Sequence, residues 1–95
     1  MEKGKTMTAK FYWEFAAIQC DPNLPKPKAV HIKQFEGDEA MAAFQYFIEW
    51  KPTILGVAHF VTLSLYEKDL NHPSDPPTML SKINAIVWGD GRKSY

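Results

Sequence analysis

The stretch GDEAMAAFQYFIEWKP, residues 37–52, decides the fold because it is the clearest helix in a 95-residue chain that otherwise favours strands. Asp38 is a good N-cap residue, and Glu39 suits the positive end of the helix dipole. Pro52 cannot continue a helix, so the segment ends after Lys51. We therefore predict a helix over residues 38–51.

The apolar residues of this helix cover more of its surface than one sheet needs. At about 100° per residue, one continuous arc holds Met41, Ile48, Phe44, Ala40, Phe47, Ala43, Trp50 and Tyr46. A helix on its own sheet needs an apolar stripe only somewhat wider than about 100°. Two explanations remain open: another segment of the chain covers the excess, or a partner subunit does. Aromatic residues dominate interface energetics, so the interface candidates are Phe44, Tyr46, Phe47 and Trp50.

The segments around the helix alternate between apolar and polar residues, which indicates strands. Residues 9–20 place Phe11, Trp13, Phe15 and Ala17 on one side, and residues 29–35 alternate in the same way after a proline-rich loop. Residues 54–67 form a long strand candidate, for which we expect a bend or bulge near Gly56. Residues 80–88 fit either a helix or a strand, and their β-branched content slightly favours a strand.

These elements predict a single α+β domain over residues 1–95. It has a small, mostly antiparallel sheet with strands near 9–20, 29–35, 54–67 and possibly 80–88, and the helix packs on one face. Residues 1–7 and 90–95 are expected to be flexible.

Charge and cysteine content narrow the function classes. Eleven basic and eleven acidic residues cancel, whereas a DNA-binding domain usually has a basic excess. A neutral protein has little electrostatic protection against association. The single cysteine, Cys20, fits a reducing compartment, and no apolar run approaches the roughly 18 residues of a membrane span. We therefore expect a cytoplasmic protein that does not enter the membrane.

No motif identifies a catalytic or metal site. His31, His59 and His72 lie on separate segments without ligand spacing, so the sequence predicts no metal and no cofactor. Cys20 could face His31 across the first hairpin, but an isolated cysteine is more often an inert small residue. A non-enzymatic protein is therefore favoured over an enzyme.

Three functional hypotheses follow. The first is an interaction protein that forms a homo-oligomer or binds a protein partner through the aromatic helix face. The second is a small-molecule binder or small enzyme, with a pocket between sheet and helix that involves Trp13, His59 and Phe60. The third, binding of single-stranded nucleic acid by strand aromatics near lysines, is disfavoured because period two sends Phe11, Trp13 and Phe15 to the face that the helix is expected to cover.

Overall fold

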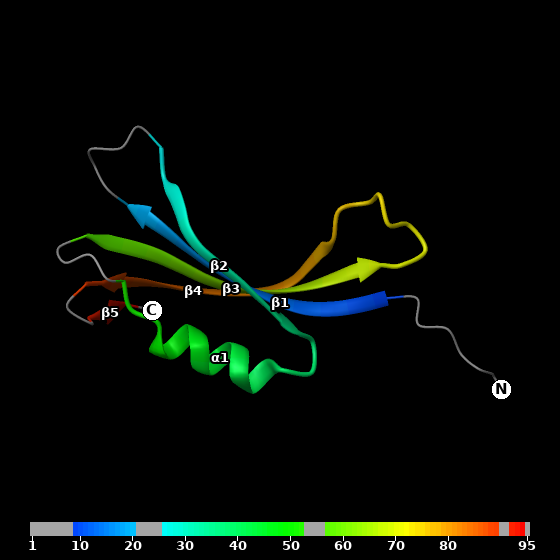
Figure 1. Ribbon diagram of the computed structural model, residues 1–95, viewed down its shortest axis with the longest axis horizontal. Helices are drawn as coiled ribbons and strands as arrows, with labels where there is room; N and C mark the ends of the chain where they lie inside the picture. Colours follow the sequence, from blue (N-terminus) through cyan, green and yellow to red (C-terminus); the bar gives the residue numbers. More distant parts are fainter. Residues whose placement is uncertain (1–8, 21–25, 53–56, 90–91, 95) are drawn as a thin grey trace.

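The computed structural model describes residues 9–20, 26–52, 57–89 and 92–94, which form an antiparallel sheet and one helix (Figure 1). In chain order the elements are β1 (Ala9–Cys20), β2 (Lys28–Glu36), α1 (Ala40–Glu49), β3 (Ala58–Asp69), β4 (Thr78–Trp88) and β5 (Lys93–Ser94). The strand order is β2-β1-β3-β4-β5, and all neighbouring strands are antiparallel. The predicted α+β class with a mostly antiparallel sheet is therefore confirmed.

The ambiguous C-terminal segment is a strand. β4 pairs with β3 from Glu67↔Thr78 to Ala58↔Trp88, so the helical alternative is wrong. Lys93 and Ser94 form a short fifth strand beside Val87 and Ile86, where the sequence predicts a loose tail. Next to this pairing, the Trp88 N–H donates a hydrogen bond to the Arg92 carbonyl at 3.0 Å.

The irregularities of the long strands differ from the expected one. The bulge predicted near Gly56 lies outside the described residues. Within them, the β1–β2 register shifts between Ala17 and Ile18, and the β3–β4 register shifts between Leu65 and Tyr66. The second shift leaves Leu80 as an extra residue of β4, because its neighbours Met79 and Ser81 oppose Tyr66 and Leu65. A bulge of this kind bends the strand and increases its twist locally.

The helix is shorter than predicted, and its cap differs. Its N-cap is Glu39 rather than Asp38, and no side chain caps the first turn. The Glu39 carboxylate instead accepts a hydrogen bond from the Glu36 N–H at 2.9 Å, outside the helix. At the other end, the helix ends at Glu49, two residues earlier than predicted, and Trp50 has extended backbone angles.

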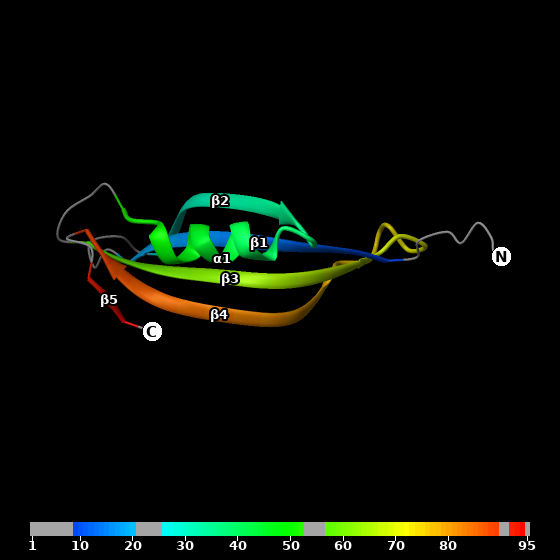
Figure 2. The same ribbon diagram turned by 90° about the horizontal axis from the view of Figure 1, so that it is seen from below.

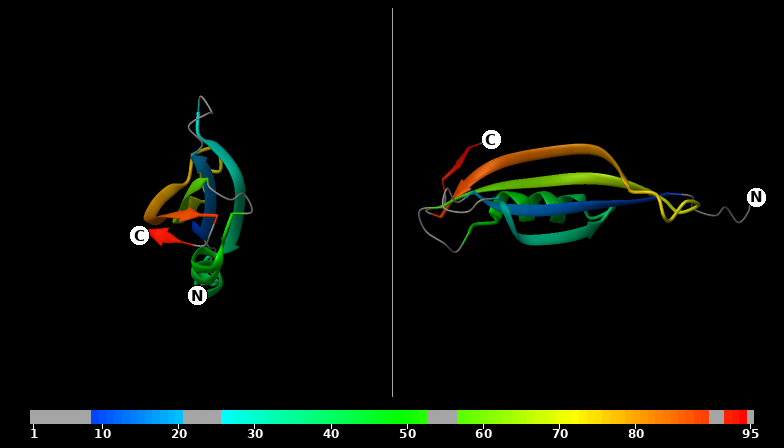
Figure 3. Two further views of the ribbon diagram at one scale, coloured as in Figure 1. Left: turned by 90° about the vertical axis from the view of Figure 1, so that its left-hand side faces the viewer. Right: turned by 90° about the horizontal axis from the view of Figure 1, so that it is seen from above.

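The core lies between α1 and one face of the sheet. Strand alternation places Phe15 and Ala17 of β1 beside residues of β3 and β4 on this face, and the register Phe15↔Leu63↔Ile83 runs across it. Figure 1 and the end-on view of Figure 3 show α1 on this side only. The buried apolar residues are Phe15, Ala17, Ala43, Phe47, Val61, Leu63, Ala85 and Val87.

The topology determines where the helix lies. β2 and β3 both flank β1 and run antiparallel to it, so the chain that joins them must cross the face of β1. Figure 2 shows α1 over β1, between β2 and β3, with β4 lying to one side. Ten helical residues span about 15 Å, whereas twelve strand residues span about 40 Å. The helix therefore covers less than half the length of the sheet. Ala85 and Val87 of β4 are buried in the core, whereas Ile83 of the same strand is 38% exposed.

Gly37 holds the start of the crossover against β1. A Cβ atom at this position would lie 2.8 Å from the Phe11 carbonyl oxygen and 2.9 Å from the Phe11 Cβ. The Gly37 carbonyl accepts a hydrogen bond from Trp13 Nε1 at 3.3 Å. The chain can approach β1 this closely because glycine has no side chain.

We expect Gly37→Ala to lower the free energy of unfolding by about 1–3 kcal/mol, as overpacking does in other proteins. The matched control is Asp38→Ala, which removes a side chain that forms no cap and should change stability by less than about 0.5 kcal/mol. Urea denaturation followed by tryptophan fluorescence measures both. A larger loss in Asp38→Ala than in Gly37→Ala would contradict the assigned cap and the close approach.

Candidate interaction site

The four interface candidates do not share one environment. Phe47 is in the core, with 3% of its surface exposed. Tyr46 and Trp50 are half-buried and pack against the core cluster. Phe44 is 38% exposed and contacts the Trp13 ring at a centroid distance of 5.2 Å. The wide apolar arc therefore divides into a side held by β1 and β2 and a side that faces β4.

On the first side, Tyr46 and Trp50 belong to an aromatic cluster with Phe15 and His31. Phe15 lies 5.0 Å from the Tyr46 ring and 5.6 Å from the Trp50 ring. His31 stacks between Tyr46, at 5.8 Å, and Trp50, at 6.5 Å. The Tyr46 hydroxyl and His31 Nε2 form a hydrogen bond that gives the polar tips a partner. The chain itself thus accommodates most of these two rings.

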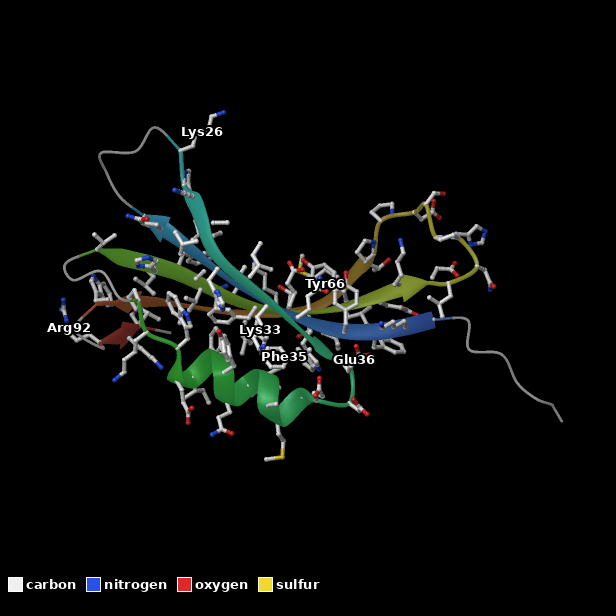
Figure 4. The ribbon with its side chains drawn as sticks, viewed as in Figure 1. Lys26, Lys33, Phe35, Glu36, Tyr66 and Arg92 are labelled. Carbon is white, nitrogen blue, oxygen red and sulfur yellow. The ribbon has the colours of Figure 1, made fainter. Side chains whose placement is uncertain are left out.

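β2 completes this side of the helix. Phe35 packs against the Tyr46 ring at 5.6 Å, and the Lys33 ammonium lies 5.8 Å from the centre of the same ring. Figure 4 shows Lys33 and Phe35 between β2 and α1, whereas Tyr66 lies on the opposite face of the sheet. A cation over a ring face is attracted by its quadrupole. β2 therefore shields the helix with both an aromatic ring and a charge.

On the second side, apolar residues of α1 and β4 remain exposed beside each other. Ile48 is 53% exposed, and Ile83 on the helix-facing side of β4 is 38% exposed, like Phe44. They border a groove of roughly 550 Å³ lined by Phe44, Phe47, Ile48, Lys82, Ile83 and Asn84. We call this groove and its lining residues the α1–β4 surface. The core on the helix side is therefore incomplete at this groove.

Sequence reasoning found Phe44 but missed Ile48 and Ile83. The signal was present in the excess width of the apolar arc, which includes Ile48 and also Met41, 87% exposed. The helical periodicity of the sequence does not show which strand lies under each side of the helix. The aromatic criterion also selected Tyr46 and Trp50, which are half-buried and pack against the core.

The three pocket candidates are not brought together. Trp13 and His59 lie on the helix face, where His59 is buried against Trp50 at a ring distance of 5.7 Å. Phe60 follows His59 directly, so its side chain points to the opposite face, in register with Ile18 and Ile86. Phe60 therefore cannot line a pocket between sheet and helix, and that part of the prediction is wrong.

A second groove, of roughly 600 Å³, lies where the sheet extends past the start of the helix. Phe11, Trp13 and Leu65 supply its apolar lining, and it is bordered by Lys10 and Glu36, whose charged groups are 3.8 Å apart. Phe11 is 44% exposed. The groove shows again that the short helix leaves part of the apolar sheet face open.

The open face of the sheet is more mixed in character. Tyr12 and Tyr66 stack there at 5.4 Å. Burial, the neighbouring Glu14 carboxylate and Tyr66 together raise the pKa of the Tyr12 hydroxyl. Glu14 also accepts a hydrogen bond from the Gln34 amide at 3.0 Å. The right panel of Figure 3 looks onto this face of the sheet, with α1 on the far side.

Among the described residues, the pairing of Cys20 with His31 that the sequence suggested is not formed. His31 pairs with Ala17 across the hairpin, whereas Cys20 lies beyond the last paired residue, Gln19, so the two do not face each other. Within the described ranges, no group of three or more His, Cys, Asp and Glu residues could hold a metal ion. At ten residues α1 is too short to cross a membrane, and the described residues contain no other helix.

The chain shows no significant similarity to any protein-family model, curated protein or solved structure. The α1–β4 surface is accordingly assigned from its exposed side chains, its groove and the position of the helix over the sheet.

The loop between β3 and β4 is ordered by the side chain of Asp69. Its carboxylate accepts hydrogen bonds from the His72 ring at 2.8 Å and from the Asn71 N–H at 2.9 Å. The Lys68 ammonium donates to the carbonyls of Pro73 and Asp75. In Figure 1 this loop turns away from the helix. The hydrogen bond to His72, followed by that to Asn71, lowers the pKa of Asp69 below its ordinary value of 3.8.

The hydrogen bond between Tyr46 and His31 gives a stability prediction. Tyr46→Phe should lower the free energy of unfolding by about 0.5–1.5 kcal/mol, the usual cost of one lost hydrogen bond. The control is Tyr66→Phe, because the Tyr66 hydroxyl forms no hydrogen bond within the described residues. Chemical denaturation of both variants decides the point. Equal losses would show that the hydroxyl of Tyr46 gains nothing from His31.

The Asp69 carboxylate gives a pH prediction. Because folding lowers the pKa of Asp69, its contribution to stability is present above pH 3.8 and is lost as pH falls through the lower folded-state value. Carbon-detected NMR titration of the carboxyl group should show this lowered midpoint. In His72→Ala the midpoint should rise toward 3.8. An unchanged midpoint would contradict the contact with His72.

Proposed function

We propose that this protein is non-enzymatic and acts by associating with protein through the α1–β4 surface. The observation that carries the proposal is the contiguous exposure of Phe44, Ile48 and Ile83 around one groove. Single exposed apolar residues are normal on protein surfaces. A joined patch of them is typical of an interaction site.

The balance between buried and exposed residues supports association. Among the described residues, five large hydrophobic side chains are buried: Phe15, Phe47, Val61, Leu63 and Val87. Eleven others are at least one-third exposed, among them Met41, Phe44, Ile48, Met79, Leu80 and Ile83. A chain of this size already buries only about two-thirds of its unfolded surface. Covering the α1–β4 surface would enlarge this small core.

The open face of the sheet supports association less well. Its large apolar residues Ile32 and Ile86 are exposed. The row across the sheet that begins at Ile32 continues through Ala16 to the polar residues Thr62 and Asn84. The α1–β4 surface has Lys82 as its only charged residue. Charged residues are depleted at the centres of interfaces, so the helix side fits a protein partner better.

Two substitutions on one strand test the proposal. Ile83→Lys places a charge on the α1–β4 surface, and Ile86→Lys places the same charge on the opposite face at nearly the same exposure, 38% against 39%. We expect Ile83→Lys to weaken association by at least about tenfold, or ~1.4 kcal/mol, and Ile86→Lys to leave it unchanged. Light scattering over a concentration series measures self-association, and an anilinonaphthalene sulfonate dye reports the apolar groove in the monomer.

Circular dichroism must show that both variants keep the wild-type fold. The proposal fails if the wild-type protein stays monomeric throughout the series and also does not bind the dye. It fails equally if Ile86→Lys, and not Ile83→Lys, disrupts association.

A further inference from the structure

Resting on the proposed function, we infer that the partner is a second copy of this chain, bound by antiparallel pairing of the two β4 edges. The dimer would join two sheets into one. The inference depends on the free edge of β4, on its single charged residue and on the register that these features select.

The first step is that β4 has an unpaired edge. On the side away from β3, its only described neighbour is β5, which pairs with Ile86 and Val87. The groove of the α1–β4 surface is lined by three consecutive residues, Lys82, Ile83 and Asn84. Successive side chains of a strand point to opposite faces, so a groove that touches all three borders the backbone at this edge. Its N–H and C=O groups are available to another strand.

The second step compares the two edges of the sheet. β2, at the other edge, carries Lys28, His31, Lys33 and Glu36 along nine residues. Charged side chains, lysine especially, are the usual protection of an edge strand against pairing. β4 carries only Lys82 among eleven residues, and its Met79, Leu80 and Ile83 are exposed. β4 is therefore the unprotected edge.

The third step is that this edge is complementary to itself. Two identical strands can pair in antiparallel orientation about a two-fold axis normal to the sheet, which gives a closed dimer. Such an axis places residues of the same face opposite each other. Because the bulge at Leu80 and the pairing of Ile86 with β5 limit the regular free segment to residues 81–85, few registers are possible.

Charge selects among these registers. An axis at Lys82 would place two ammonium groups opposite each other, which is destabilising. An axis at Ile83 places Lys82 opposite Asn84 and Ser81 opposite Ala85. It also places the two Ile83 side chains together on the helix face, beside Phe44 and Ile48 of each copy. Pairing about Ile83 thus uses the whole regular segment and makes no like-charge contact.

Cysteine cross-linking tests the register in a Cys20→Ser background, which removes the exposed native thiol. Directly opposed residues of an antiparallel pair have Cα atoms about 4.5–5.5 Å apart, within the range of about 4.4–6.8 Å for a disulfide. Ile83→Cys should therefore form a disulfide-linked dimer in mild oxidant. Ser81→Cys is the matched control, because its two copies would lie about 13 Å apart along the strands.

Hydrogen exchange provides a second readout that needs no substitution. In the wild-type protein, those backbone amides of residues 81–85 that point away from β3 should become at least about tenfold more protected at concentrations where light scattering shows a dimer. Amides of β2 should not change, because that edge stays free.

The outcomes separate the two proposals. Rapid cross-linking of Ile83→Cys but not Ser81→Cys, together with protection of β4, supports the inference. If Ile83→Lys dissociates the dimer but Ile83→Cys does not cross-link and β4 gains no protection, edge pairing is overturned and association through the helix side stands. Equal cross-linking of both cysteine variants overturns the register. A wild-type protein that is monomeric at every concentration overturns the inference whatever the dye shows.

Discussion

The crossover from β2 to β3 is the constraint on which the structure depends. Because these strands flank β1 and run parallel to each other, the connecting helix must lie over β1. Gly37 anchors its start against Phe11 and Trp13, and Trp50 anchors its end against Phe15 and His31. A helix of ten residues placed there shields the middle of the sheet but leaves Ile83 of β4 and Phe11 of β1 exposed. The exposed apolar residues follow from this geometry.

Much of the fold could be predicted from local patterns. Alternation at Phe11, Trp13, Phe15 and Ala17 indicates a half-buried strand, and the helix lies within the predicted range but ends at Glu49, before Lys51 and Pro52. Residues 78–88 were ambiguous because a short apolar run satisfies both periods, and pairing with β3 decides for a strand. The bulge at Leu80 and the short strand β5 depend on partners distant in sequence, so no local pattern could show them.

The site was less predictable than the fold, for a related reason. Helical periodicity shows that Tyr46, Trp50, Phe44 and Ile48 share an apolar arc, but it does not show where the sheet ends beneath that arc. Tyr46 and Trp50 find β1 and β2, whereas Phe44 and Ile48 face toward the side of β4. Which apolar residues of the helix are buried and which are exposed thus depends on the strand order, and the sequence alone does not give that order.

Pairing of the two β4 edges would not by itself cover the α1–β4 surface. A two-fold axis normal to the sheet puts both helices on the same face, so the two grooves meet over the paired Ile83 residues. Each helix lies over β1, the second strand in from β4, and neighbouring strands are about 4.8 Å apart, so the two helices would stand too far apart to pack directly. The dimer would satisfy the backbone of β4 while Phe44 and Ile48 form facing walls of a shared trough.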